Sequence, residues 1–529
     1  MFGLDLPRKF KPNKMKNYFR LLLPTFLLLT CFSCDKIDDF LGDGGTDDEQ
    51  PTDDTPVATS VDFSFVNTFD VDGEDSAEIS AYDPATKRLF VTNGALDEIT
   101  VFDISDVNSP SRIGTVNCPN PGSPNSVAVS NGILAVAIAA ENEQDNGFVE
   151  FFDTSTLEEI GIVQVGALPD MVAFTPNGEY ALTANEGEPN DEYTVDPEGS
   201  VSIIKVETME VTTLGFTAFN SQEADLESAG FRVFGPGADL ATDVEPEFLT
   251  ISDDGTTAWV TLQENNGVAV VNLESMQIES ILPLGFKDYS LPGNEIDPSN
   301  EDGRTELRSV PVFGIYQPDA IAYYTINGMD YIVTANEGDA RDYDGFSEEE
   351  RMADLVFDET VFPDAATLQL DENLGRLQST TTLGDTDGDG DFDELYNYGA
   401  RSFSIWSGMG QLVFDSGNDI AEITLDLTPD VFNGGDNRSD DKGAEPEAVS
   451  ILEIGERQIL FVGLERNNQV MVYDITNPSF PEFIQLLSAD GDVGPEGVLP
   501  IAAEDSPTGN DILIVSNEVS GTVTIYENN

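Results

Sequence analysis

Apolar and polar residues alternate along most of the chain from residue 60 onward, in short runs separated by Gly, Asn and Asp. Segments such as VAFTPNGEYALTA (172–184) and VFDSG (413–417) have the period of two that is typical of half-buried β-strands. The one stretch with helical character is an insertion near Ser347–Asp354. The pattern therefore predicts an all-β fold.

A strand–turn–strand phrase recurs along this region, as in PDMVAFTPNGEYALTAN (169–185) and PDAIAYYTINGMDYIVTAN (318–336). A third strand usually follows, and units of about 45 residues of this kind indicate a β-propeller with one four-stranded sheet per unit. We count eight repeat units; seven blades is the alternative, because the fifth and sixth units are the least regular. The last unit ends after its third strand, so VDFSFVNTF (61–69) is expected to pair with the C-terminal unit and close the ring.

The second residue of the phrase is acidic in six of the eight units. In a propeller this position begins the innermost strand at one mouth of the central channel, and the antiparallel second strand ends at the same mouth. The first set of positions is Glu78, Asn125, Asp170, Glu247, Asp319, Arg401, Glu447 and Glu496, and the second set includes Glu186, Glu264, Glu337, Glu465, Arg466 and Glu518. Asp339 and Arg341, in the insertion that follows Glu337, are candidate ligand-binding residues as well. The long insertions fall on that face too, which is the usual arrangement for a binding site. The alternative is that several of these carboxylates simply face water.

The stretch DTDGDGDFDE (385–394) carries six carboxylates in ten residues. Asp385, Asp387, Asp389, Asp391 and Asp393, with Gly390 at the sixth position, match the first half of a calcium-binding loop. The twelfth position is Tyr396 rather than Glu, so the loop is not a complete EF-hand. We predict calcium as the cofactor here; the alternative is a solvated acidic turn.

Acidic residues dominate the composition: 100 Asp and Glu against 23 Lys and Arg give a net charge of −77 over 529 residues. A field of that sign repels phosphate backbones, so nucleic acid is excluded as a partner. The chain has no histidine, which removes imidazole metal ligands and any Ser-His-Asp triad. Its three cysteines, Cys31, Cys34 and Cys118, provide neither a disulfide framework nor a thiolate zinc site.

The N-terminus has the pattern of a targeting segment. Basic residues precede the apolar run LLLPTFLLLTCFSC (21–34), which is too short to span a bilayer and fits a signal peptide. The end of the run resembles a bacterial lipobox, with Cys34 as the lipid-modified first residue of the mature chain. We therefore predict a signal peptide over residues 1–33, an acidic disordered tether over 34–59 and one propeller domain over 60–529. The predicted location is the outer membrane, held through the lipid on Cys34 and surface-exposed; a secreted or periplasmic protein is the alternative.

Four long motifs resemble a known family, that of the choice-of-anchor I domain proteins. They are LPDMVAFTPNGEYALTANEGEPNDEYTVDPEGSVSII, PDAIAYYTINGMDYIVTANEGDARDYDGF, GDTDGDGDFDELYNYGARSFSIW and SNEVSGTVTIYE. The resemblance covers about residues 60–529. It implies a secreted β-propeller that different members attach to the cell surface by different anchors, and it implies no firm activity.

Two function classes remain. The first is a surface-anchored, calcium-dependent binding or adhesion module whose acidic funnel takes an unknown surface ligand. The alternative is a metal-dependent hydrolase of the phosphatase or phytase kind, with Asp and Glu as metal ligands and Arg341, Arg401 and Arg466 as clamps on a phosphate-bearing small molecule. No nucleophile motif assigns catalytic residues.

Overall fold

The computed structural model describes residues 60–529 except 72, 74–75, 119 and 121. The predicted signal peptide, the lipidation site Cys34 and the tether over 34–59 lie outside the described residues. No helix in the described part of the chain is both long and apolar enough to cross a membrane.

Seven four-stranded antiparallel sheets form the propeller in the described residues, and we number them as blades 1 to 7 in chain order. Blades 1 to 4 use consecutive strands: β2 (Ser80–Asp83), β3 (Arg88–Asn93), β4 (Glu98–Asp103) and β5 (Ser111–Val116); β6 (Pro124–Ser130), β7 (Ile133–Ile138), β8 (Asn146–Asp153) and β9 (Glu159–Ala167); β10 (Pro169–Phe174), β11 (Tyr180–Asn185), β12 (Ser200–Lys205) and β13 (Glu210–Gly215); β14 (Pro246–Ile251), β15 (Thr257–Leu262), β16 (Gly267–Asn272) and β17 (Gln277–Pro283).

In blade 5 an insertion separates the second strand from the third, and blade 7 combines three C-terminal strands with one N-terminal strand. The strands of blades 5 to 7 are β20 (Ile321–Ile326), β21 (Met329–Asn336), β27 (Ser402–Ser407) and β28 (Leu412–Asp415); β29 (Pro446–Ile454), β30 (Arg457–Leu464), β31 (Gln469–Asp474) and β32 (Glu482–Leu487); β33 (Pro495–Ile501), β34 (Ile512–Asn517), β35 (Thr522–Asn528) and β1 (Phe63–Asp70). Strand β1 pairs with β35, with Phe63 opposite Asn528 and Asp70 opposite Thr522. The predicted outer strand from the N-terminal segment is thus confirmed.

The blades form a closed ring. The innermost strands β2, β6, β10, β14, β20, β29 and β33 each contact the next one along the chain, and β33 also contacts β2. The central strands are buried on both faces, as in β7, because each blade lies between two others. A separate apolar cluster fills each of the seven blade interfaces; Phe461, for example, packs between blades 6 and 7. Truncating such a side chain to Ala typically costs about 3–5 kcal/mol.

The count of eight units is wrong, since blade 5 accounts for two of them. A long insertion separates β21 from β27, so the outer half of the blade looks like a new unit in the sequence. Hydrogen bonding decides the point, because β27 pairs with β21, with Thr334 opposite Ser404. Arg401 therefore precedes the third strand of blade 5 and does not begin an innermost strand.

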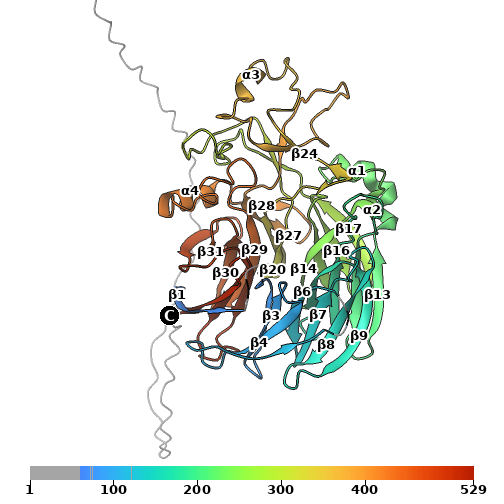
Figure 1. Cartoon of the computed structure of the whole chain (residues 1–529), viewed down its shortest axis with the longest axis vertical. Helices are drawn as coiled ribbons and strands as arrows, with labels where there is room; N and C mark the ends of the chain where they lie inside the picture. The colour runs from blue at the N-terminus through green and yellow to red at the C-terminus, as the bar shows by residue number, and fades with distance from the viewer. Residues whose placement is uncertain (1–59, 72, 74–75, 119, 121) are drawn as a thin grey trace, which may run out of the picture. The chain divides into compact units, whose positions relative to one another are not determined.

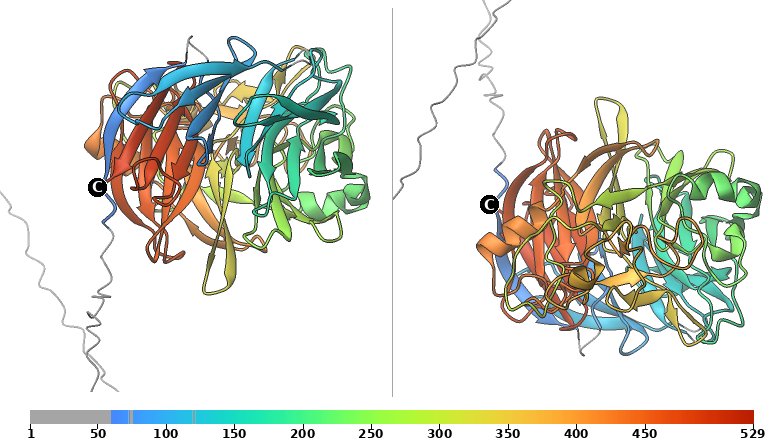
Figure 2. Two further views of the ribbon diagram at one scale, coloured as in Figure 1. Left: turned by 90° about the horizontal axis from the view of Figure 1, so that it is seen from below. Right: turned by 90° about the horizontal axis from the view of Figure 1, so that it is seen from above.

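The insertions lie on one face of the ring (Figures 1 and 2). They contain β18 (Phe286–Asp288), β19 (Phe313–Ile315), β22 (Asp342–Tyr343), β23 (Phe346–Ser347), β24 (Glu349–Arg351), β25 (Gln378–Thr380), β26 (Tyr396–Asn397), the 3-10 helix η1 (Thr217–Gln222), α1 (Glu223–Glu227), α2 (Leu240–Asp243), α3 (Ala365–Leu368) and α4 (Asp419–Leu427). An apolar cluster that includes Tyr289, Met352 and Phe357 gives the insertions around blade 5 a core of their own. The expected helix near 347–354 is wrong: the chain there forms β23 and β24.

Candidate functional site

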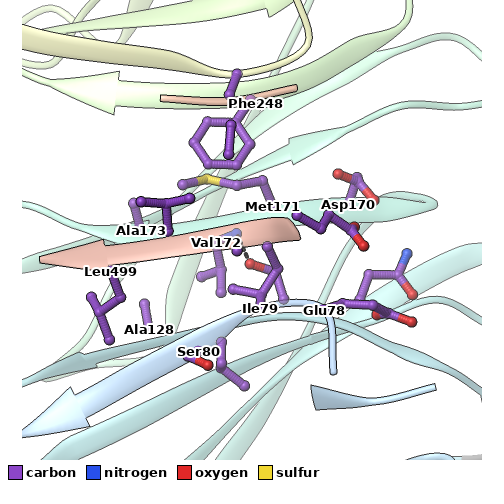
Figure 3. A pocket seen from close by; sticks show the side chains of 18 of the residues that line it. Glu78, Ile79, Ser80, Ala128, Asp170, Met171, Val172, Ala173, Phe248 and Leu499 are labelled. Atoms are coloured by element: carbon purple, nitrogen blue, oxygen red, sulfur yellow. Dashed lines mark hydrogen bonds between the residues drawn. The ribbon is translucent and has the colours of Figure 1, made fainter. Parts of the chain in front are cut away.

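A cavity of about 790 Å³ runs through the middle of the ring. Residues at or just before the start of all seven innermost strands line it, and we call this set the acid ring: Glu78, Asn125, Asp170, Glu247, Asp319, Glu447 and Glu496. Figure 3 shows Asp170 and Glu78 close to each other near one end of the view. The structure thus brings seven of the eight aligned positions to one cavity, while Arg401 is not among the described residues that line it.

Local backbone geometry positions the ring acids. In blades 2, 3, 4, 6 and 7 the acid or amide follows a proline, and the register of the innermost strand shifts directly after that proline. Such bulges re-aim side chains at strand ends. Leu168, Gln317 and Glu445, each directly before a proline, have φ values of 46°, 41° and 52°. Left-handed backbone at residues other than glycine is strained and is concentrated at functional sites.

Burial and mutual repulsion raise the pKa values of the ring carboxyls. Loss of solvent is the larger cause at Glu78, whose pKa rises to about 7, followed by the charges of Glu518 and Asp170. Burial likewise raises the pKa of Asp170 to about 6, against a hydrogen bond from Asn125 that lowers it. The pKa values of Glu247, Asp319, Glu447 and Glu496 lie well above the usual range, again through burial first and neighbouring carboxylates second.

Five further glutamates follow the second strands of blades 3 to 7: Glu186, Glu264, Glu337, Glu465 and Glu518. Burial raises the pKa of Glu186 well above normal, and the charges of Glu247, Glu188 and Asp170 add to the effect. Glu518 acts in the same way on Glu78 and Glu496. The structure therefore brings the predicted residues Glu186 and Glu518 into the electrostatic neighbourhood of the acid ring.

Glu337 is the residue of this second set that lines the cavity itself. Its carboxylate accepts a hydrogen bond from Gln263 at 3.1 Å and pairs with Lys442 at 2.7 Å. Lys442 lies 3.5 Å from the predicted residue Asp339 and provides the only cation among the described residues lining the cavity. Sequence reasoning missed Lys442 because it lies in an insertion and outside the repeated phrase.

The buried asparagines before these glutamates have a structural role. The side-chain amide of Asn185 donates to the hydroxyls of Ser200 and Ser202, and that of Asn336 donates in the same way to Ser402 and Ser404. Each asparagine thus joins the second strand to the third and leaves the next residue, a glutamate, at the site.

Comparison with known proteins assigns this architecture to a family. The model of the choice-of-anchor I domain matches residues 78–478, which is most of the chain. The chain belongs to the choice-of-anchor I domain family. Membership fits a propeller that is anchored at the cell surface or secreted.

Two curated relatives share part of this choice-of-anchor I chain. Gigasin-3a of Magallana gigas is 30% identical over 189 residues, covering 30% of this chain and 66% of the relative. The mesenchyme-specific cell surface glycoprotein of Strongylocentrotus purpuratus is 27% identical over 334 residues, covering 54% and 40%. The match thus spans less than two thirds of either relative.

Solved structures with a similar arrangement include hydrazine synthase of Kuenenia stuttgartiensis, with a TM-score of 0.48, 15% identity, and coverage of 86% of this chain and 96% of the other. The β-propeller domain of Cps50 (Swd1) from Myceliophteria thermophila has a TM-score of 0.45, 7% identity, and coverage of 88% and 100%.

The three arginines predicted as phosphate clamps are engaged elsewhere in the choice-of-anchor I propeller. Arg341 has a side chain only 1% exposed and pairs with Asp243 at 2.7 Å and Glu245 at 2.9 Å. Arg401 is buried and donates to the backbone carbonyls of Asp297, Ser439 and Asp441. Both side chains hold insertions in place.

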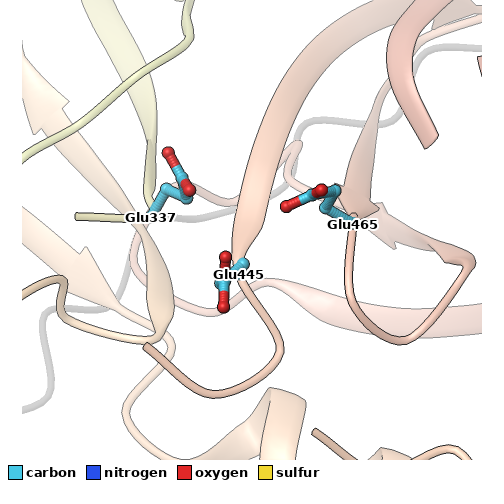
Figure 4. A group of neighbouring side chains, drawn as sticks. All are labelled: Glu337, Glu445 and Glu465. Carbon is cyan, nitrogen blue, oxygen red and sulfur yellow. The ribbon is translucent and has the colours of Figure 1, made fainter. Parts of the chain in front are cut away.

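Arg466 belongs to a group of ion pairs beside the acid ring. The carboxylates of Glu337, Glu445 and Glu465 have oxygens within 4.8 Å of one another (Figure 4). Lys442 is 2.7 Å from Glu337, Arg438 is 2.6 Å from Glu445, and Arg466 is 3.0 Å from Glu445 and 2.6 Å from Glu465. Burial tends to raise the pKa of Glu445, but the charges of Lys442, Arg438 and Arg466 lower it below its normal value. The protein's own cations neutralise this group.

The Asp385–Asp393 loop provides two overlapping carboxylate groups at the surface of an insertion. One consists of Asp385, Asp387 and Asp393, the other of Asp358, Asp391 and Asp393, and within each group the oxygens lie within 4.8 Å of one another. Asp389 is in neither group. Asp358 was missed from the sequence because it lies 27 residues before the loop; its amide donates to the carbonyl of Phe392 at 3.0 Å.

Within the loop, the carboxylate of Asp385 accepts from the amides of Gly388, Asp389 and Gly390. Gly390 has a φ of 97°, a left-handed conformation that favours glycine. The pKa of Asp391 rises to about 6 through partial desolvation and the neighbouring carboxylates Asp389, Asp358 and Asp393. Two groups that share Asp393 can hold oxygen-coordinated cations such as calcium.

Proposed function

We propose that this chain is a surface-anchored binding propeller that takes a cationic ligand into its acidic cavity and depends on calcium at the Asp385–Asp393 loop for its full stability. The observation that carries the proposal is the convergence of six carboxylates, from six blades, on one cavity. A cation entering there relieves both the repulsion among these groups and the cost of their burial. The lipid on Cys34 would hold the propeller at the outer membrane.

A thermal-shift experiment tests the cavity. Guanidinium, calcium and phosphate salts are added at low concentration to the full chain at constant ionic strength, and the melting temperature is compared with that of Glu496→Gln. Guanidinium is expected to raise the melting temperature of the wild type more than that of the variant, because binding to the folded state alone stabilises it by mass action. Calcium is expected to act at the Asp385–Asp393 loop and to stabilise both proteins alike, and phosphate is expected to have no effect. Equal responses of the two proteins to guanidinium would overturn the proposal.

The anchor has its own test. Mass spectrometry of the mature chain is expected to show acyl groups on an N-terminal Cys34, and an unmodified N-terminus at another residue would contradict lipidation. We do not propose hydrolysis as a second function, because Arg341 and Arg466 are already ion-paired to carboxylates and Arg401 lies outside the cavity.

A further inference from the structure

The cavity is acidic at one end and apolar along its length. In blade 3, the first strand residues are Pro169 and Asp170, and Met171, Val172 and Phe174 follow along the cavity wall. Figure 3 shows Met171 beside the ring of Phe248, and Leu499 of blade 7 on another part of the wall. A six-residue strand spans about 20 Å, so the wall is long enough for an extended organic molecule. A purely ionic ligand leaves this apolar wall unused.

The ring acids are too widely spaced for one metal ion. Calcium needs six to eight oxygens at about 2.3–2.6 Å, which requires oxygens to converge on one point. No three members of the acid ring have oxygens within 4.8 Å of one another in the described structure. The cavity of about 790 Å³ is also far larger than an ion, and it falls in the range of about 300–1,000 Å³ typical of small-molecule sites.

The ring offers acceptors that lack donors. Glu247 and Glu447, from blades 4 and 6, each have one buried carboxyl oxygen, Oε2, without a hydrogen-bond partner among the described residues. Buried carboxyl oxygens normally have a partner. An alkylammonium group has three donors and no acceptor, so it can donate to an unpartnered oxygen such as one of these without needing three or more carboxylates to converge on one point as a metal ion does.

From this division of the cavity we infer that its ligand is a protonated alkylamine, with the ammonium group among the ring acids and the alkyl chain along the wall formed by Met171, Phe248 and Leu499. The inference rests on the proposed function and narrows its cationic ligand to one chemical class. Two sources present this group: a free alkylamine and the lysine side chain of a peptide.

Isothermal titration calorimetry of the full chain tests the assignment with octylammonium chloride, octan-1-ol and ammonium chloride. Octylammonium is expected to bind saturably at one site. Octanol lacks the charge and ammonium lacks the alkyl chain, so each is expected to bind at least tenfold more weakly than octylammonium. A short acetylated peptide with one central lysine is the second probe. If the peptide binds more tightly than octylammonium, the source is a peptide side chain; the reverse order indicates a free amine.

Two variants test the acidic end and the apolar wall of the cavity separately. Glu247→Gln with Glu447→Gln is expected to weaken octylammonium at least tenfold and leave octanol unchanged, whereas Phe248→Ala weakens both probes. Glu158→Gln, at an exposed turn of blade 2, is the matched control and should bind like the wild type. If circular dichroism shows that the double variant does not fold, the single variant Glu447→Gln takes its place.

The outcomes separate this inference from the proposed function. Equal affinity for octylammonium and octanol, or no octylammonium binding, overturns the alkylamine assignment. If guanidinium still stabilises the wild type more than Glu496→Gln, the binding propeller survives that failure. If no cation distinguishes the two proteins, both fail.

Discussion

The acid ring and the Asp385–Asp393 loop are both built from carboxylates, but their carboxylates are held in opposite ways. The ring acids come from six separate blades, lie in a cavity and have raised pKa values because burial disfavours their charge. The loop acids come from one short segment with Asp358, lie at the surface and crowd within 4.8 Å of one another. Wide spacing in a buried site favours protons and large cations, whereas crowding in water favours a small metal ion.

Removing Lys442, the one cation among the described residues that line the cavity, should have the largest effect. Lys442→Met leaves Glu337 buried without its ion pair, and we expect the free energy of unfolding to fall by about 3 kcal/mol. Adding Glu337→Gln should recover most of the loss, because the unpaired charge is then gone. Chemical denaturation measures both variants.

The control for that experiment is Lys205→Met, which breaks an exposed pair with Glu179 at 3.9 Å. A surface pair of this kind contributes less than about 1 kcal/mol. A similar loss in both lysine variants would mean that net charge, and not the cavity, sets the stability.

The ring should also make stability depend on pH. Glu78 and Asp170 have folded pKa values of about 7 and about 6, above their normal values of 4.5 and 3.8. Their neutral forms therefore favour folding at low pH, and this contribution is lost as the pH rises through 6 and 7. Because Glu78 is only partly buried, solvent reduces the effect, and we expect the free energy of unfolding to fall by about 2 kcal/mol between pH 5 and pH 8, measured by denaturant titration.

The matched variant for the pH experiment is Glu78→Gln with Asp170→Asn, which should flatten the profile between pH 5 and pH 8. Glu158→Gln should keep the slope of the wild type. An unchanged slope in the double variant would show that other groups are responsible for the pH dependence.

Calcium at the loop should have the smallest effect of the three. Saturating calcium is expected to raise the melting temperature by about 2 °C, since it binds the folded loop and not the unfolded chain. Asp387→Asn with Asp391→Asn removes one ligand from each carboxylate group and should abolish the shift. Asp389→Asn, which changes neither group, should retain it. Loss of the shift in Asp389→Asn alone would contradict the two-group arrangement.

The sequence predicted the ring well because each blade repeats the same phrase. Alignment of Asp170 with Glu247 and Glu496 needs no knowledge of tertiary structure, since a propeller places equivalent residues at equivalent radii. The same reasoning failed at blade 5, because its inner hairpin (β20 and β21) and its outer hairpin (β27 and β28) show a similar alternation of apolar and polar residues. Only the pairing of β27 with β21 shows that the two hairpins belong to one blade.

Residues outside the repeat could not be predicted in this way. Lys442 reaches the cavity from an insertion, and Asp358 approaches the loop through a bridge between Phe357 and Phe392. Arg341 looked like a ligand clamp because the sequence does not show that Asp243 and Glu245 surround it. Asp83 ends β2 directly before a turn, where the sequence suggests exposure, yet it is buried and accepts hydrogen bonds from Thr86 and Thr154. Contacts between distant segments decide each of these cases.

The pairing of β1 with β35 has a mechanical consequence. Strand β1 begins at Phe63, so a pulling force that acts along the chain from its N-terminal side reaches the propeller at this outermost strand. The strand can peel away from β35 while the other three strands of blade 7 remain joined to blade 1 through the contact of β33 with β2. Peeling adds slack to the chain before any blade of the ring is extended. The outer strand of blade 7 can therefore yield to such a force before the force reaches the ring and its cavity.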